Sequence, residues 1–143
     1  MWCAEITERS VLSALNGIDA SFRASRVDDE ALSPVEKNAL PAIVISADGG
    51  SPQGYLSIFY TVGLTVTITT SIVDDPKRTQ LASLEDSVRT VLDGDMADTF
   101  NAIGAQYNWY FKGITDCVGG LVELLDNKQQ SVSVEMIFRL CKG

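Results

Sequence analysis

SIFYTVGLTVTITTSI, residues 57–72, is the stretch that decides the fold of this chain. Apolar side chains occupy nearly every second position, and small side chains, mostly threonine, lie between them. This alternation is typical of a β-strand that packs one face on a core and presents the other to water or a polar neighbour. Threonine is branched at Cβ, so it favours the extended backbone while presenting a hydroxyl group. We predict one long strand over 57–72, after which Pro76 prevents continuation.

The predicted strand is long for so small a protein. Sixteen residues would span roughly 50 Å at about 3.3 Å per residue, whereas a domain of 143 residues is only about 30 Å across. Either a bulge near Gly63 bends the strand around the sheet, or part of it projects beyond the domain. A projecting strand has open hydrogen-bonding edges, and pairing with a neighbouring subunit is one way to close them.

Two helices are predicted from apolar residues at helical spacing. The first covers residues 6–15. The second lies within 79–95, where Thr79 is a candidate cap and Gly94 a candidate end. Its apolar stripe consists of Leu81, Leu84, Val88, Val91 and Leu92. A helix of this kind is expected to lie on the apolar face of the sheet.

Loops and one short strand precede the long strand. Residues 19–40 are mixed, and their acidic group at 28–30 is interpreted as a solvated loop, with a contact or ion site as the alternative. Pro41 opens an apolar run that predicts a short buried strand over 42–45. The segment 47–56 is rich in glycine and proline and is interpreted as a surface loop without a phosphate-binding motif.

The C-terminal part predicts an antiparallel hairpin. Residues 112–126 and 131–143 are two strand-like runs separated by the polar turn NKQQ. Gly119 and Gly120 predict a bulge or bend in the first run.

The expected order is therefore helix, strand, long strand, helix, strand, strand. We predict a single α+β domain over residues 1–143. It would contain a four-stranded, mainly antiparallel sheet with a long second strand, and helices packed on one face.

Composition argues against several classes of function. The net charge is −8, and only 11 basic residues are scattered along the chain. Stable wrapping of nucleic acid is not expected, because that relies on Lys and Arg neutralising phosphates. An acidic wall would instead repel DNA and let it slide past. The chain has no histidine, which removes Ser-His-Asp and Cys-His catalysis and HExxH zinc chemistry.

The cysteines and the chain start indicate an unprocessed cytosolic protein. Cys3, Cys117 and Cys141 are odd in number and lack CxxC spacing, so we expect reduced thiols rather than a disulfide framework or a structural zinc site. The start MWCAEITERS lacks the basic and apolar segments of a signal peptide. No apolar run reaches the ~18 residues that a membrane helix needs.

Clusters of carboxylates do not predict a reaction. Asp74 and Asp75 are interpreted as strand-ending and helix-entry residues. Asp93, Asp95 and Asp98 superficially resemble a calcium loop, but the bidentate Glu and the regular ligand spacing are missing. We therefore predict a non-enzyme with no cofactor and no metal, acting by binding or assembly.

The aromatic segment 107–111 allows two interpretations. Tyr107, Trp109, Tyr110 and Phe111 either form a core corner followed by a strand start, or anchor a subunit interface. Tyr and Trp are enriched at interfaces.

The order of these features resembles the tail terminator and tail completion proteins at the neck of long-tailed bacteriophages. The resemblance rests on the helix at 6–15, the LPAIVI strand start at 40–45, the Gly/Pro-rich loop and the strand 57–72. The helix LASLEDSVRTVL and the closing strand pair complete it. It is a likeness of pattern over most of the chain, and segment 107–111 does not match.

The resemblance implies a homo-oligomeric ring, usually a hexamer, in the virion neck. Such a ring caps the tail tube and contacts the tube protein and the head–tail connector proteins. DNA passes through its centre without specific binding, and no membrane, catalysis or cofactor is implied. The subunit would be made in the host cytoplasm.

The interface residues follow from the loop, the threonine face and the aromatic segment. Loop 47–56 is expected to reach a neighbour or the tube, and the Thr-rich face or edge of 57–72 to line the ring. The candidates are Asp48, Gln53, Tyr55, Phe59, Thr65, Thr67, Thr69, Tyr107 and Trp109.

Two other functions remain open. One is a different virion part, such as a head-completion or connector protein or a tail tube subunit. The other is a small-molecule binding module or enzyme, which would require a deep apolar pocket with convergent polar groups.

Overall fold

The structure is a computed structural model that describes residues 1–16, 23–26, 40–52, 54, 57–94, 96–120, 122–125 and 128–143. Its helices are α1 (Cys3–Leu15), α2 (Thr79–Asp93), α3 (Met96–Gly104) and the short 3-10 helix η2 (Ala105–Tyr107). Its strands are β1 (Arg23–Arg26), β2 (Ala42–Pro52), β3 (Phe59–Ser71), β4 (Trp109–Gly119), β5 (Glu123–Leu125) and β6 (Gln129–Lys142). The predicted α+β class is confirmed.

The sheet has six strands, so the prediction of four was wrong in this detail. The strand order is β1-β2-β3-β6-β4, and β5 pairs with β6. All pairs are antiparallel except β1 with β2, which is parallel. The two additional strands are β1 with four residues and β5 with three. Strands this short carry too few residues for an alternating pattern to be recognised.

The long strand lies in the middle of the sheet. β3 has 13 residues and is paired with β2 on one edge and with β6 along its whole length on the other. The predicted open edges were therefore wrong, because both are satisfied within the chain. Gly63 pairs regularly with Asp48 and Ile137, so the predicted bulge near Gly63 was also wrong. The irregularity lies in β2, between Gly49 and Ser51.

The segment predicted as a surface loop belongs largely to β2. β2 extends from Ala42 to Pro52, well beyond the predicted 42–45. Gly49 and Gly50 have φ values of 98° and 95°, which side-chain-bearing residues rarely adopt. These two glycines form the bulge through which the strand continues, so the predicted surface loop over 47–56 was wrong for the residues up to Pro52.

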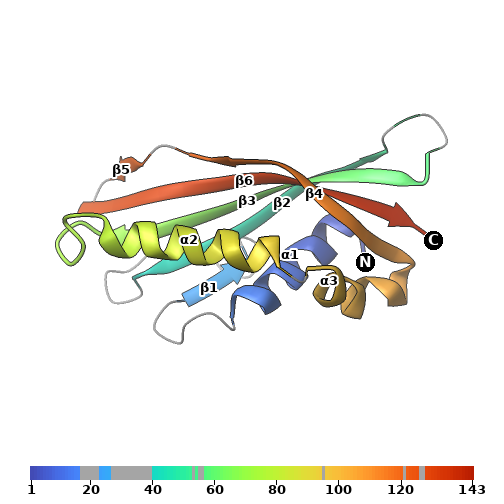
Figure 1. The fold of residues 1–143 in the computed structure, drawn as a ribbon, viewed down its shortest axis with the longest axis horizontal. Helices are drawn as coiled ribbons and strands as arrows, with labels where there is room; N and C mark the ends of the chain where they lie inside the picture. The colour runs from blue at the N-terminus through green and yellow to red at the C-terminus, as the bar shows by residue number, and fades with distance from the viewer. Residues whose placement is uncertain are drawn as a thin grey trace.

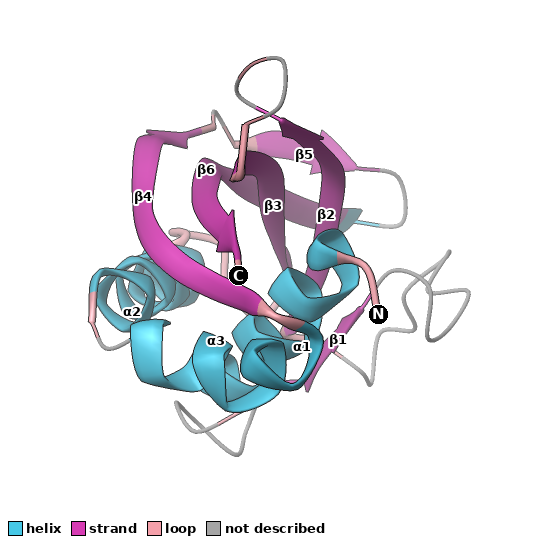
Figure 2. Ribbon diagram, turned by 90° about the vertical axis from the view of Figure 1, so that its right-hand side faces the viewer, coloured by secondary structure: helices cyan, strands magenta, loops and turns pink. Residues whose placement is uncertain are grey.

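All three α-helices lie on one face of the sheet, as predicted (Figures 1 and 2). The even-numbered residues of β3 and β6 point toward them and are buried: Val62, Leu64, Val66, Ile68, Val132, Val134, Met136, Phe138 and Leu140. Helix α3 was not predicted. It has only nine residues, and it buries Met96 and Phe100 against the strands. No helix in the described part of the chain is long and apolar enough to cross a bilayer.

Helix α2 is capped by a residue from the preceding turn. Backbone N–H groups of Gln80 and Leu81 donate to the Asp75 carboxylate, each at 3.0 Å. The Thr70 hydroxyl also donates to the Asp75 carboxylate, at 3.2 Å. Thr79 is the first helical residue and makes no cap, so its predicted role as the cap was wrong. Gly94 ends the helix, as predicted. The helix-entry role predicted for Asp75 is confirmed.

The predicted C-terminal hairpin is confirmed. β4 and β5 both run antiparallel to β6, and β4 ends at Gly119. The first arm of the hairpin is interrupted at Gly119 and Gly120, as predicted from this pair of glycines. There the Gly120 N–H donates to the Ser133 carbonyl at 2.6 Å. β6 begins at Gln129, two residues earlier than expected.

Candidate functional site

The side of the sheet opposite the helices is the candidate assembly surface. We call it the open face, because no described helix lies on it (Figures 1 and 2). It carries the odd-numbered residues of β3 and β6 with their partners in β2 and β4. Thr65 and Thr67 are half-buried there, and the Thr67 and Ser133 hydroxyls are hydrogen-bonded at 3.1 Å. The side chains of this face are therefore small and polar at Thr65 and Thr67 of β3 and at Ser133 of β6.

Three of the other predicted interface residues, Asp48, Phe59 and Thr69, belong to this side of the sheet. Asp48 lies opposite Gly63 and is exposed. Phe59 opens β3 and is 40% exposed, and Thr69 is buried at 6%. Gln53 and Tyr55 lie outside the described residues.

The aromatic segment 107–111 is divided between core and surface. Trp109 is only 1% exposed, so it packs in the core and does not anchor a surface, which is a correction to its candidate role. Its ring contacts Trp2 and Tyr60 edge-on, with centroids 5.6 and 5.0 Å away. Tyr107 and Tyr110 remain exposed. This part of the chain is thus the core corner and strand start of the first interpretation, with two tyrosines at the surface.

Sequence reasoning missed the β6 side of the open face. Glu135, Ile137 and Arg139 lie beside Thr65, Gly63 and Thr61 in register. Glu135 and Arg139 are exposed. The alternation in 131–143 already indicated that these odd positions share one face, so the signal was present in the sequence.

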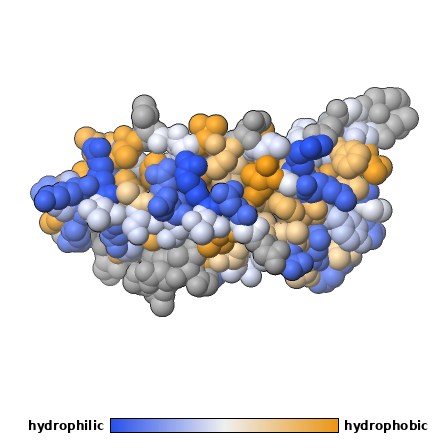
Figure 3. Space-filling view, viewed as in Figure 1, coloured by the Kyte–Doolittle hydropathy of each residue, from blue (hydrophilic) through white to orange (hydrophobic). Residues whose placement is uncertain are grey.

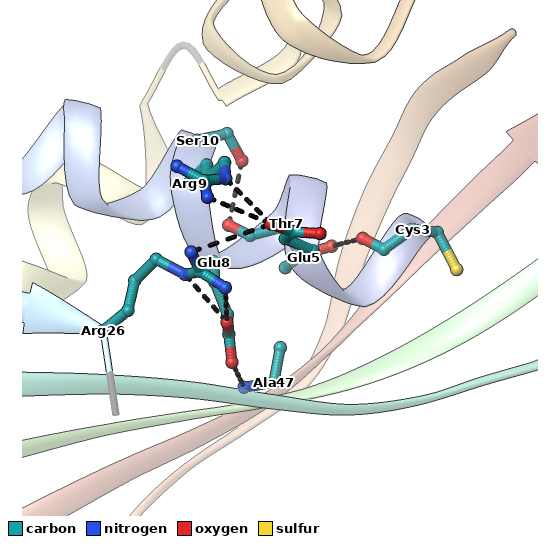
Figure 4. A network of polar contacts seen from close by, with 8 residues as sticks. All are labelled: Cys3, Glu5, Thr7, Glu8, Arg9, Ser10, Arg26 and Ala47. Atoms are coloured by element: carbon teal, nitrogen blue, oxygen red, sulfur yellow. Dashed lines mark hydrogen bonds and ion pairs between the residues drawn. The ribbon is translucent and has the colours of Figure 1, made fainter. Parts of the chain in front are cut away.

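The outer edge of β2 is closed by side chains of α1 and of Trp2, the residue before it. β1 pairs with β2 only as far as Ile45. Beyond it, the Ala47 N–H donates to Glu8 Oε2 at 2.8 Å (Figure 4). The Trp2 indole N–H donates to the Gly49 carbonyl at 3.1 Å. Backbone groups that another strand would need are therefore occupied.

Glu8 is held in place by a buried ion pair. Its Oε1 accepts from Arg26 Nε and Nη2, each at 2.9 Å, and both residues are at most 5% exposed (Figure 4). Arg26 Nη1 also lies 3.9 Å from Glu5 Oε1, which pairs with Arg9. Charges this deeply buried are tolerated only when paired and hydrogen-bonded. The pair therefore links α1, β1 and β2.

The other edge of the sheet is irregular. β4 shifts register between Phe111 and Gly113, and again between Thr115 and Val118. Bulges of this kind bend an edge strand and interrupt the ladder that an added strand would follow. With α1 covering the opposite edge, the open face is the larger surface left for a partner.

A hollow lies in the middle of the open face. It is lined by Asp48, Gly63, Leu64, Thr65, Val118, Glu135, Met136 and Ile137. A second hollow lies on the outer side of α2, around Ser83, Asp86 and Thr90. Neither joins a deep apolar interior with converging polar groups, which a small-molecule module would require.

The described residues hold no group of three or more His, Cys, Asp or Glu side chains arranged to bind a metal ion. Asp95, a member of the calcium-like set, lies outside the described residues.

The three cysteines are free, with Cys3 buried and Cys117 exposed. Burial raises the pKa of the Cys3 thiol above its usual value. Arg89 Nη1 lies 3.4 Å from Cys117 Sγ. The absence of enzymatic activity stays a prediction.

No protein-family model and no curated protein matches the chain.

Proposed function

We propose that the chain is a structural subunit of a bacteriophage neck. Six copies would form a ring at the head-proximal end of the tail tube, terminate the tail and join it to the head. DNA would pass through the ring without being bound. The proposal keeps the function that the sequence pattern implies and adds a surface through which copies meet.

One observation carries the proposal. The open face runs along strands of 13 and 14 residues, and no helix of the described residues covers it, while the edges of the sheet are closed or irregular. A sheet face of this length is a surface on which another copy can pack. If each copy packs on the next through this face with the same rotation between them, the copies close into a ring, as in cyclic oligomers.

Charge is compatible with a DNA channel. The chain carries −8, and its basic residues do not cluster in the way that duplex binding needs. A ring of six such chains would repel the phosphate backbone from its walls.

The native mass and the particle shape test the proposal. We expect a mass six times the 15.5 kDa of one chain, measured by light scattering, and rings with a central opening in electron micrographs. Added to purified tail tubes, the protein should bind one end only. A monomer at high concentration that leaves tubes unbound would exclude the proposal.

Charge placed on the open face tests the surface. Thr67→Glu should lower the mass, because a carboxylate would be buried between copies without a partner. Ala82→Glu on the exposed side of α2 is the matched control and should leave the mass unchanged. An unchanged mass for Thr67→Glu would remove the open face from the interface.

A second candidate is a tail tube subunit or a head-completion protein with the same fold. The open face favours self-association in that case as well. Polymerisation into long tubes without a cap, or binding to the head portal rather than the tail, would select it.

A further inference from the structure

The end of the sheet at which β3 begins and β6 ends carries most of the large apolar side chains that the described residues expose. Ten such side chains are exposed among the described residues, and six of them lie at this end: Met1, Trp2, Ile58, Phe59, Tyr107 and Tyr110. We call these six residues the apolar end. Figure 3 shows apolar and hydrophilic side chains beside one another in this region, on the right of the view.

The register of the sheet places this group in its outermost rows. Phe59 and Tyr110 both lie opposite Cys141, on the open face. In the next row outward, the Lys142 N–H donates to the Ile58 carbonyl at 2.9 Å. Consecutive rows are about 3.3 Å apart, so these side chains lie within roughly 10 Å of the end of the sheet.

Trp2 adds an aromatic ring on the helix side of the same end. Its ring contacts Tyr60 and Trp109 edge-on, with centroids 6.3 and 5.6 Å away, and it is 50% exposed. Aromatic rings therefore flank the end of the sheet on both sides, with Phe59 and Tyr110 on the open face and Trp2 on the other.

This end differs in charge from the rest of the chain. The chain has 19 acidic residues, and none of them lies in the segments that form this end, which are 1–4, 57–62, 106–114 and 138–143. The same segments carry three exposed cations, Lys112, Arg139 and Lys142. None of the three forms an ion pair with a described residue. The end is therefore locally cationic, although the net charge of the chain is −8.

The acids that border this end do not cancel its charge. The Glu5 carboxylate binds Arg9 at 3.0 Å. Asp48 lies opposite Gly63, four residues further along β3 than Phe59, which corresponds to about 13 Å. At physiological ionic strength, exposed charges more than about 8 Å apart are largely screened from one another. A surface that meets this end would therefore respond mainly to the three cations.

We infer that the apolar end docks on a lipid bilayer whose surface carries anionic headgroups. Tryptophan and tyrosine favour the membrane–water interface, since their rings are apolar and their N–H and O–H groups are polar. Lysine and arginine near the surface are attracted by anionic lipids. Interfacial segments enter a bilayer by about 5–10 Å, which matches the depth of the rows that carry these rings. The inference goes beyond the proposed function, which involves no membrane, and does not depend on it.

A protein partner is the alternative occupant. Tyr, Trp and Phe are also enriched at protein interfaces, but Lys is depleted there. A lysine stem can instead lie along lipid while its ammonium reaches the headgroups. At this end, Lys142 lies with Nζ 4.8 Å from the centroid of the Trp109 ring, so its ammonium stays beside the aromatic group. A second copy is disfavoured, because two apolar ends in contact would bring the cations of both copies together without an acid from either end.

Flotation with vesicles tests the inference. The full chain is mixed with phosphatidylcholine vesicles that contain about 30% phosphatidylserine, and with vesicles of phosphatidylcholine alone. We expect the protein to float with the anionic vesicles and to stay largely unbound with the neutral ones. The chain has two tryptophans, and Trp109 is only 1% exposed, so quenching by brominated lipids reports on Trp2. We expect the anionic vesicles to quench this emission.

Two variants locate the contact, each with a matched control at the other end of the molecule. Ile58→Glu changes a side chain that is 55% exposed, and Val73→Glu changes one that is also 55% exposed. Lys112→Glu reverses an exposed cation at the apolar end, and Lys77→Glu reverses one shortly before α2. We expect Ile58→Glu and Lys112→Glu each to lower vesicle binding at least about tenfold, and both controls to bind like the wild type. Thermal unfolding checks that every variant folds.

The outcomes separate this inference from the proposed function. Wild-type protein that fails to float with anionic vesicles would overturn the inference, and loss of tail-tube binding in Ile58→Glu would then assign the end to a protein partner. Equal flotation with neutral vesicles would overturn the role of the cations. Binding that neither Ile58→Glu nor Lys112→Glu weakens, or that the controls weaken equally, would overturn the location. A monomer that floats would overturn the ring and leave this inference standing, whereas a ring that does not float would do the reverse.

Discussion

Glu8 Oε2 accepts the hydrogen bond of the Ala47 N–H at 2.8 Å, at the point where β1 has ended and the edge of β2 is otherwise unpaired. A helix side chain thus replaces the strand that the edge lacks. Because the other carboxylate oxygen binds Arg26, this one residue secures both the helix and the short strand β1.

Glu8→Gln is expected to lower the free energy of unfolding by about 3 kcal/mol, since it removes the charge from a buried pair and leaves Arg26 without its nearest carboxylate. Urea denaturation measures the change. Glu5→Gln is the control, because Glu5 is partly exposed and its loss should cost less than about 1 kcal/mol. Equal effects of the two variants would contradict the role assigned to Glu8.

Asp75→Ala is expected to cost about 2 kcal/mol. It removes the acceptor of two helix N–H groups and the partner of the buried Thr70 hydroxyl. Circular dichroism during thermal unfolding reports the loss. Asp74→Ala changes an exposed neighbour and should stay within about 0.5 kcal/mol of the wild type.

The cysteines should react in the order of their exposure. At pH 8, a thiol reagent followed by mass spectrometry should modify Cys117 first and Cys3 last, because Cys3 is buried. Burial also raises the pKa of Cys3, so little thiolate forms in the folded chain. The stability that this shift contributes is present below the ordinary thiol pKa and is lost as the pH rises through the raised value. Early labelling of Cys3 would contradict its burial.

Two glycines of neighbouring strands should respond oppositely to alanine. At Gly50, φ is 95° and an added Cβ would lie 2.4 Å from Trp2 Nε1, so Gly50→Ala should cost about 1–3 kcal/mol. At Gly63 there is room and φ lies outside the glycine-favouring range, so Gly63→Ala should add about 0.5–1 kcal/mol. Chemical denaturation of both variants provides the comparison.

The core was largely predictable from the sequence because alternation and helical spacing report directly which side chains are buried. The even residues from Val62 to Thr70, four of the five residues in the stripe of α2 and the even residues from Val132 to Leu140 are buried. Such patterns can be recognised from residues close together in the sequence, without knowledge of which strands pair.

Strand neighbours and edge closure could not be predicted in the same way. Glu8, Arg26 and Ala47 are far apart in the sequence, and nothing local indicates that a helix carboxylate will bind a strand N–H. Likewise, Gly49 and Gly50 indicated a surface loop, although here they let a strand continue through a bulge. Trp109 is of a residue type that is common at interfaces. Only the packing of Trp2 and Tyr60 around its ring shows that it is buried.

The closed edge of β2 has a consequence for synthesis. A chain with strands of 13 and 14 residues is at risk of joining its neighbours by endless strand pairing into fibres whenever it is made in quantity. Glu8 and Trp2 occupy two backbone groups of β2 at which such growth could start, and this removes part of the edge that a second chain would need.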